Sequence, residues 1–322
     1  MLRVAEFVIV ISAIQLTSIL NKVGKFMTTI TVQQYDAFST VPNMGNPAGV
    51  VVKGDHYSEK EMQKIAKQVG FNETAFAMTS EKADIRIRYF TPGHEVNLCG
   101  HATMATIFAL QSQGLLANKT TITIETKAGI LPIRLEEKAG NLYITMQHAA
   151  PQFEAFNGSK AALAESIGIV EDELHPDLPI VYGSTGLWTL LIPVRYLASF
   201  EKMNPQTAKF PSILNEMPNA SLHPFCLEAL DETADMHARH FSSPYSGTIQ
   251  DIVTGTASGV MGAYYAQYVD REVAYPKTLV VEQGQELGRD GRVQVHVNKV
   301  DNNLNISITG TAVYVKDLKV HI

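Results

Sequence analysis

Cysteine is scarce in this sequence, which has only Cys99 and Cys226 among 322 residues. Two cysteines outside any C-x-x-C pair cannot form a disulfide framework, and their scarcity fits a reducing compartment such as the cytoplasm. The sequence also lacks runs of basic residues. It has 26 Lys and Arg and 32 Asp and Glu, for a net charge of −6. Without a basic stripe, nucleic acid is not an expected partner. We therefore expect a cytoplasmic protein that does not bind nucleic acid.

The signatures of common cofactor and metal sites are missing as well. The GTASG segment at residues 255–259 lacks the GK[ST] ending of a phosphate-binding loop, and no G-x-G-x-x-G follows a predicted strand. None of the ten histidines falls in a metal-ligand spacing. His237 and His240 are close enough to share a helix face, but no acid or cysteine set completes a site, so we expect surface histidines. The sequence therefore predicts neither a cofactor nor a metal.

No apolar run is long enough for a membrane helix. The run at residues 7–20 is shorter than the ~20 residues that a span requires, and no A-x-A cleavage site follows it. Met27 is followed by TTITVQQYDAF, which predicts the first strand of a folded domain. We treat residues 1–26 as an extension; an upstream in-frame extension, a weak targeting segment and a partner helix remain open for it.

Composition and length favour two globular domains. Hydrophobic residues make up 45% and charged residues 18% of the chain, an ordinary globular mixture. A helix is predicted from Ser58, which can form a capping box with Glu61, to Gly70. Most of the remaining core shows the period-two pattern of strands, and the last strands are joined by an Asn-Asn turn at residues 302–303.

Two predicted helices stand apart because they are apolar on every side. CGHATMATIFALQSQG (99–114) and TGTASGVMGAYYAQYV (254–269) both begin with glycine and small residues, and a helix that is apolar all round is buried. Their first glycines, Gly100 and Gly255, lie about half the core apart. This spacing suggests an internal duplication, with domains at residues 27–147 and 148–322.

Three segments carry residues suited to chemistry. Glu73 lies between aromatic residues just after a predicted helix, where partial desolvation would raise the pKa of its carboxyl toward that of a useful general base. His101 follows Gly100 at the start of the first apolar helix, where free N–H groups favour anions. Asp251 precedes the second such helix. A solvated loop acid, a core histidine and an ordinary helix cap are the alternative interpretations of the three segments.

Taken together, these segments resemble the PhzF family, whose members share the diaminopimelate-epimerase fold. The matching landmarks, in the family's order and spanning nearly all of the core, are YDAFSTVPNMGNPAGVVV (35–52), IAKQVGFNETAF (65–76), FTPGHEVNLCGHATMAT (90–106), STGLWTLLIPV (184–194), RHFSSP (239–244) and QDIVTGTASG (250–259). The resemblance implies an α+β fold of two pseudo-repeated domains, each with a curved, mostly antiparallel sheet around a central helix. It also implies that the last strand, near residues 308–322, returns to the first domain.

The resemblance assigns roles residue by residue. It makes Glu73 the general acid and base, with His101 and Asp251 as the other catalytic residues. Substrate binding falls to Asn46, Gly100, Ala102, Gly255 and Thr256. Two positions depart from the family pattern: Thr256 stands where relatives have serine, and Asn97 where many have aspartate.

The implied activity is a cofactor-free isomerisation of a small carboxylate-bearing metabolite, related to that of trans-2,3-dihydro-3-hydroxyanthranilate isomerase. Two alternatives remain: an amino-acid epimerase or racemase, and a non-catalytic metabolite-binding protein on the same fold. A two-thiol racemase needs a cysteine at the start of each central helix, and only Cys99 occupies such a place, so we expect Cys99 to be a packing residue. The resemblance further implies a homodimer.

Overall fold

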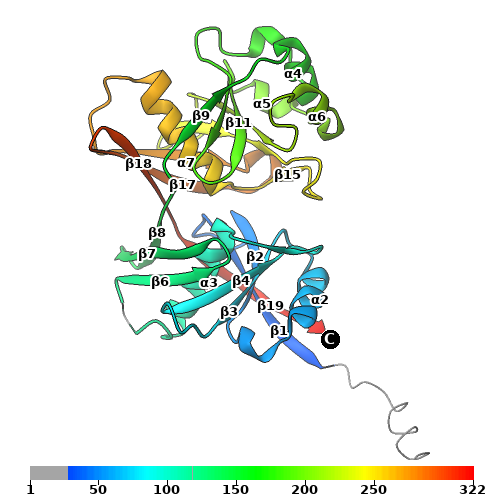
Figure 1. Cartoon of the computed structure of the whole chain (residues 1–322), viewed down its shortest axis with the longest axis vertical. Helices are drawn as coiled ribbons and strands as arrows, with labels where there is room; N and C mark the ends of the chain where they lie inside the picture. Colours follow the sequence, from blue (N-terminus) through cyan, green and yellow to red (C-terminus); the bar gives the residue numbers. More distant parts are fainter. Residues whose placement is uncertain (1–27, 118) are drawn as a thin grey trace, which may run out of the picture.

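The computed structural model describes residues 28–117 and 119–322, so the extension predicted at residues 1–26 lies outside the described residues. Two lobes are stacked along the long axis, the lower one coloured mainly blue to green and the upper one mainly green to orange (Figure 1). Their strands join in one 19-stranded, mostly antiparallel sheet system. No helix in the described residues is long and apolar enough to cross a membrane.

The lower lobe is built mainly from the first half of the chain. It contains β1 (Thr29–Ala37), β2 (Asn46–Val51), α2 (Glu59–Val69), β3 (Thr74–Met78), β4 (Ile85–Phe90), β5 (Glu95–Val96), α3 (Gly100–Ser112), β6 (Thr121–Thr126), β7 (Gly129–Lys138), β8 (Asn141–Gln147) and β19 (Ala312–His321). The sheet curves around α3, which packs against β1, β2, β3, β8 and β19. Nine of the thirteen α3 residues are buried, as its apolar sequence predicted.

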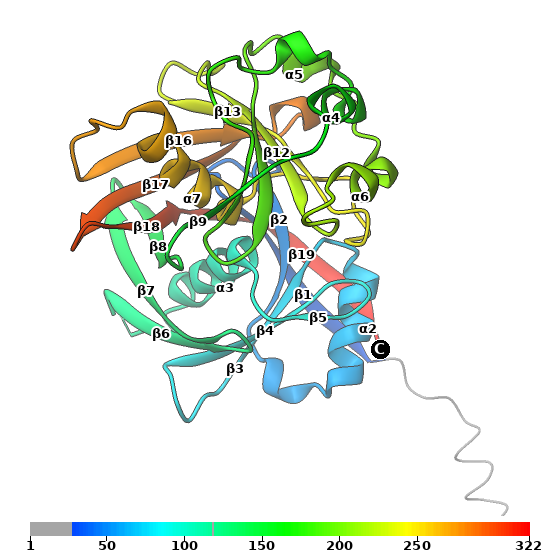
Figure 2. The same cartoon turned by 45° about the horizontal axis from the view of Figure 1, so that its top comes forward.

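The upper lobe repeats this plan around α7. It contains β9 (Gln152–Ala155), α4 (Lys160–Ile167), β10 (Val181–Ser184), β11 (Trp188–Pro193), α5 (Ser199–Lys202), α6 (Phe210–Ile213), β12 (Ser221–Cys226), β13 (Met236–Ala238), β14 (His240–Phe241), β15 (Gln250–Asp251), α7 (Gly255–Tyr264), β16 (Lys277–Gln283), β17 (Gly291–Val300) and β18 (Asn303–Gly310). Helix α7 is buried against β10, β17 and β18. The helices α3 and α7 contact each other at the centre of the molecule (Figure 2).

The predicted capping-box helix is α2. Oε2 of Glu61 accepts hydrogen bonds from the backbone N–H of Ser58 at 2.8 Å and from its hydroxyl at 2.7 Å, and Gly70 ends the helix in the left-handed conformation. Because the apolar side of α2 packs on β3, β4 and β19, the helix fixes the start of the segment that carries Glu73.

Strands β18 and β19 connect the two lobes. β18 pairs with β17 of the upper lobe and β8 of the lower lobe, and β19 pairs along the whole of β1. The turn before β18 differs from the predicted Asn-Asn turn, because Asp301 and Asn302 take the positive φ values and Asn303 already belongs to β18. We retain the proposed domain boundary between residues 147 and 148, which falls at the end of β8.

Candidate active site

The starts of the two central helices occupy equivalent positions in the two lobes. Cys99 is the N-cap of α3 and Thr254 is the N-cap of α7, and each precedes the glycine that opens its helix. The first turn of a helix presents unpaired N–H groups and a positive end of the helix dipole. Nδ2 of Asn46 bonds the carbonyl of Val253 beside the start of α7 and lies 3.4 Å from Nδ1 of His101 in the first turn of α3. Both helix starts therefore adjoin one central region.

Glu73 lies beside the start of α3. Its backbone carbonyl accepts a hydrogen bond from Gly49 at 3.2 Å, which fixes the residue just ahead of β3. Its Oε2 lies 3.3 Å from Nε2 of His101, with side-chain exposures of 19% for Glu73 and 8% for His101. Burial raises the pKa of the Glu73 carboxyl; Asp251 raises it further, while His101 and Cys99 oppose the shift. A carboxylate with a raised pKa is a stronger base than an exposed glutamate, which favours a role in proton transfer.

Asp251 connects the two lobes through its side chain. Its Oδ1 accepts hydrogen bonds from Asn46 Nδ2 at 2.8 Å, Asn72 Nδ2 at 3.2 Å and the backbone of Ile252 at 3.1 Å. Its Oδ2 accepts from the Thr254 hydroxyl at 2.6 Å. With both oxygens engaged, Asp251 holds the residue next to Glu73, the N-cap of α7 and the end of the β1–β2 turn in one arrangement.

Asn46 is fully buried at the centre of this network. Its Nδ2 also donates to the backbone carbonyl of Val253 at 2.9 Å and lies 3.4 Å from Nδ1 of His101. Two acceptors on Nδ2 fix the orientation of the amide, because the flipped amide would place an oxygen against two oxygens. Its Oδ1 has no hydrogen-bond partner in the described residues, which leaves one buried acceptor free beside the site.

The two opening glycines differ in the space around them. A Cβ added at Gly100 would meet no atom within 4 Å, whereas one added at Gly255 would lie 2.6 Å from Cδ1 of Ile308 and 3.0 Å from Cζ of Phe38. Gly255 is therefore required for packing, while Gly100 leaves room for an approaching ligand. The remaining predicted binding residues lie in the same helix starts: Ala102 is fully buried, and the carbonyl of Thr256 accepts a hydrogen bond from Thr185.

The structure also brings in residues that the sequence did not assign to the site. Cys99, expected only to pack, has its sulfur 3.4 Å from Nδ1 of His101. Cys99, His101 and Glu73 each offer one ligand-type atom, and these three atoms lie within 4.8 Å of one another. Asn72 and Thr254 join through Asp251, as described above. Asn72 precedes Glu73 and Thr254 precedes Gly255 in the sequence, and this adjacency could have indicated that both belong to the site.

The prediction of surface positions for His237 and His240 is wrong. Both lie on short strands rather than a helix, and both are buried. His237 lies between Glu282 and Glu286, with 2.7 Å from each ring nitrogen to a carboxylate oxygen. These partners are more than forty residues away in the chain, so no local pattern reveals them.

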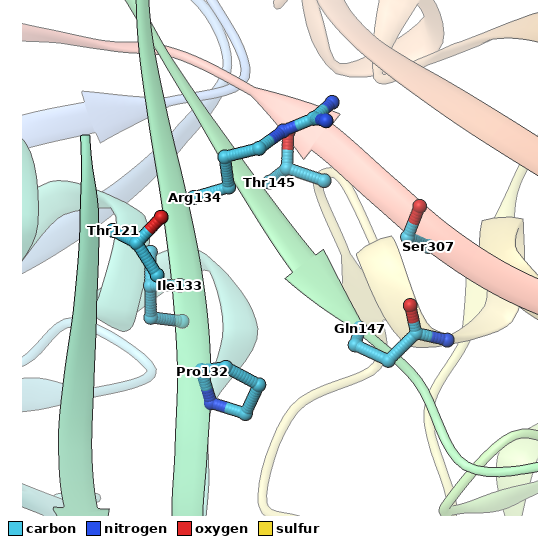
Figure 3. Close-up of a pocket in the computed structure, with 7 residues that line it drawn as sticks. All are labelled: Thr121, Pro132, Ile133, Arg134, Thr145, Gln147 and Ser307. Atoms are coloured by element: carbon cyan, nitrogen blue, oxygen red, sulfur yellow. The ribbon is translucent and has the colours of Figure 1, made fainter.

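Two surface hollows lie outside the central region. One, of about 310 Å³, is lined by residues of β6, β7, β8 and β18, namely Thr121, Pro132, Ile133, Arg134, Thr145, Gln147 and Ser307 (Figure 3). The other, of about 510 Å³, is lined by Leu197, Ala198, Glu201, Glu228, Leu230, Gln285 and Glu286. Neither contains a predicted site residue.

Comparisons with known proteins identify the family of the chain. Residues 35–317 match the family described as phenazine biosynthesis-like protein, PhzC-PhzF. A Bacillus subtilis protein named uncharacterized isomerase YfhB is 50% identical over 288 residues, covering 89% of this chain and 97% of that protein. The trans-2,3-dihydro-3-hydroxyanthranilate isomerase of Pseudomonas aeruginosa is 28% identical over 264 residues, covering 80% of this chain and 87% of that protein.

Solved structures support the fold. The crystal structure of the Bacillus anthracis phenazine biosynthesis protein of the PhzF family is 57% identical, with a TM-score of 0.90 over 92% of this chain and 100% of that chain. A hydroxyproline epimerase from Agrobacterium vitis is only 11% identical, with a TM-score of 0.58 over 91% and 93% of the two chains, so this likeness concerns the fold alone. The predicted epimerase-like α+β fold is confirmed.

Proposed function

Because the chain belongs to the phenazine biosynthesis-like PhzF family, we propose that it shifts a proton between carbon atoms of a small carboxylate-bearing metabolite, with Glu73 as general acid and base. The protein is an isomerase, as its relatives are named. The observation that supports the role of Glu73 is its position: a partly buried carboxyl with a raised pKa lies beside His101 and the open space at Gly100.

The proposed reaction needs one proton and no net change in oxidation. The Glu73 carboxylate takes a proton from a substrate carbon, and the electron pair of that C–H bond enters the conjugated system of the substrate. The protonated carboxyl then returns the proton to another carbon of that system, which moves a double bond and restores the carboxylate. One group can serve both steps because its pKa lies closer to neutrality than that of an exposed glutamate.

The helix starts supply the groups that would hold the substrate. Backbone N–H groups at Gly100, Ala102, Gly255 and Thr256 suit the substrate carboxylate, since helix N-termini favour anions. His101 lies between this region and Glu73, where it can orient the carboxyl or donate to the substrate. Asp251 acts in this proposal as a positioning residue, because four donors already engage its carboxylate. Asn46 adds its free Oδ1 as an acceptor.

The structure gives a reason to prefer this reaction over two-thiol racemisation. A second thiol would have to replace Thr254, the counterpart of Cys99 at the start of α7. The Thr254 hydroxyl instead donates to Asp251 at 2.6 Å, and an alcohol is far less acidic than a thiol. Thr254 therefore has a structural role, in which it holds the side chain of Asp251 at the start of α7.

Proton NMR in deuterated water tests the proposal. The wild-type protein and the Glu73→Gln variant would each be incubated with trans-2,3-dihydro-3-hydroxyanthranilate and a panel of cyclic and amino-acid carboxylates. We expect solvent deuterium at carbon in at least one compound with the wild type and not with the variant. Turnover without incorporation of solvent hydrogen, or incorporation that persists in Glu73→Gln and disappears in Cys99→Ala, would overturn the assignment.

The two opening glycines allow a paired prediction. Gly100→Ala should leave unfolding unchanged but lower kcat/KM about tenfold or more, because the methyl group enters the space reserved for the ligand. Gly255→Ala should instead destabilise the protein by about 1–3 kcal/mol through overpacking against Ile308 and Phe38. Chemical denaturation and steady-state kinetics of both variants measure the contrast. Equal effects of the two substitutions on stability would contradict it.

The homodimer and the cytoplasmic location inferred from the sequence are part of this proposal. Light scattering at micromolar concentration tests the first, and a monomeric mass would refute it. Fractionation of the cells that make the protein tests the second.

A further inference from the structure

Two histidines of the upper lobe, His223 on β12 and His240 on β14, form a pair next to Asp251. Their Nδ1 atoms lie 3.2 Å apart. His240 is directly opposite Asp251 in the antiparallel pairing of β14 with β15, which places both side chains on one face of the sheet with their Cβ atoms about 5 Å apart. The next residue, Phe241, points to the other face, into the core that contains α4, α5 and α6. Because the charge of Asp251 also acts on the Glu73 carboxyl, the histidine pair adjoins the central region.

The surroundings of the pair determine which ring nitrogens carry hydrogen. Burial lowers the pKa of His240 to about 4 and that of His223 well below its usual value, so the folded protein favours the neutral form of both rings, with one N–H each. The contact between the two Nδ1 atoms requires one of them to donate and the other to accept. Nε2 of His223 is buried and has no partner in the described residues, and a buried N–H without an acceptor is rare and costly. The hydrogen of His223 therefore belongs on Nδ1, and that of His240 on Nε2.

Nε2 of His240 is then a hydrogen-bond donor without an acceptor. The two nitrogens of an imidazole point in widely different directions, so Nε2 of His240 points away from its contact with His223. It has no hydrogen-bond partner among residues 28–117 and 119–322, and unlike Nε2 of His223 it is not sealed from solvent, since 9% of His240 is exposed. The acceptor for this N–H must therefore come from solvent or from a bound molecule.

The charge of Asp251 determines which acceptor suits this donor. The Asp251 carboxylate acts electrostatically on His240, and it would repel a second carboxylate at the same place. A neutral imidazole carries no charge to offset that repulsion, whereas the helix starts at Gly100 and Gly255 favour anions. A hydroxyl or carbonyl oxygen can accept the hydrogen bond without bringing a charge.

We infer that Nε2 of His240 donates a hydrogen bond to a hydroxyl or carbonyl oxygen of the substrate, and that His223 fixes the tautomer of His240 for this contact. The inference rests on the proposed function and narrows its substrate class to small carboxylates that carry a second, neutral oxygen. His240 selects the substrate, His223 is a positioning residue, and Glu73 moves the proton.

NMR of the histidine nitrogens tests the pair in the wild-type protein without any assay of activity. In full-length protein with isotope-labelled histidine, we expect the Nδ1–H tautomer at His223 and the Nε2–H tautomer at His240. The probe 3-hydroxyanthranilate has a carboxylate and a ring hydroxyl, and it should shift the Nε2 signal of His240 more than anthranilate, which lacks the hydroxyl. The opposite tautomers, or a His240 signal that 3-hydroxyanthranilate leaves in place, would overturn the inference.

The affinities for the same two probes measure the contact. His240→Leu should weaken binding of 3-hydroxyanthranilate about tenfold, the usual value of one hydrogen bond, and leave that of anthranilate unchanged. His240→Gln, which restores an N–H donor, should recover part of the loss, and His223→Phe should lose less, because His240 then adopts the donor tautomer part of the time. His296→Leu is the matched control, since the ring nitrogens of this half-buried histidine bond Thr278 and Thr309, and it should alter neither affinity.

The inference and the proposed proton transfer fail in different ways. Glu73→Gln should keep the wild-type preference for 3-hydroxyanthranilate over anthranilate, because it removes the proton carrier and not the donor. Equal affinities of the wild type for the two probes would overturn the role of His240 and leave that of Glu73 intact. A preference that depends on His240, in a protein whose proton exchange does not need Glu73, would support this contact and refute the proposed reaction.

Discussion

Glu73→Gln is expected to lower kcat by about 10²–10⁴-fold, the usual contribution of a positioned general acid or base. The amide keeps the size of the side chain and can still accept a hydrogen bond from His101, but it cannot carry a proton between carbon atoms. Because Glu73 is only partly buried and, among residues 28–117 and 119–322, its single ion-pair contact is with His101, the thermal unfolding temperature should change little. The comparison of kcat with KM then separates proton transfer from binding, since loss of binding alone would raise KM.

Two further variants sharpen this comparison. Glu73→Asp keeps a carboxylate but withdraws it by one methylene group, so we expect it to retain part of the activity that Glu73→Gln loses. Asp84→Asn is the matched control for loss of a carboxylate in the same lobe, because Asp84 bonds Thr123 and Lys119 away from the helix starts. It should lower stability slightly and leave kcat unchanged. A Glu73→Gln enzyme with wild-type kcat on an identified substrate would exclude Glu73 as the proton carrier.

Local sequence patterns were enough to predict the elements that carry this site. A helix that is apolar on every side has no solvent-facing stripe, so the central positions of α3 and α7 followed from residues 99–114 and 254–269 alone. The capping box at Ser58 and Glu61 is likewise complete within one turn of chain. Both predictions use interactions between residues close in sequence, which a single sequence displays directly.

Local sequence patterns could not predict contacts between residues that are far apart in the chain. Asn46 and Asp251 are 205 positions apart, and the network that joins the lobes exists only once both halves have folded. Cys99 was predicted to be a packing residue because no second cysteine stands at the start of the other central helix, while its neighbours in space are Glu73 and His101. The family resemblance grouped Glu73, His101 and Asp251, which the fold brings near one another, but it did not give the position of the thiol among them.

His237→Gln is expected to destabilise the protein by about 3–5 kcal/mol, the usual cost of removing one member of a buried ion pair. His237 and Glu282 are both fully buried, with 2.7 Å between Nδ1 and Oε1, and Glu286 bonds the other ring nitrogen. Burial alone would lower the pKa of His237, but the hydrogen bonds to Glu282 and Glu286 raise it. In the variant, the Glu282 carboxylate keeps two backbone donors and Arg292 at 3.5 Å as its partners within the described residues.

His223→Gln is the matched control, because His223 is also fully buried in the upper lobe but has no carboxylate partner in the part of the chain that the structure describes. Its Nδ1 lies 3.2 Å from Nδ1 of His240, and its Nε2 has no partner in the described residues. Burial lowers the pKa of His223 well below its usual value, and the neighbouring His240 adds to the effect. The folded protein therefore favours the neutral form of His223, whereas the carboxylates beside His237 favour its protonated form.

The two histidines should consequently give opposite dependences of stability on pH. The folded state holds its proton on His237 more tightly than the unfolded state, so this stabilisation is complete below about pH 6.5, the unfolded pKa, and is lost as the pH rises through the folded value. For His223 the contribution is present above about pH 6.5 and is lost as the pH falls. Denaturant unfolding from pH 5 to pH 9 should therefore show a flatter alkaline limb for His237→Gln and a flatter acid limb for His223→Gln. Because each substitution removes a different slope from the same curve, parallel curves for the two variants would mean that the pKa of His237 is not raised in the folded protein.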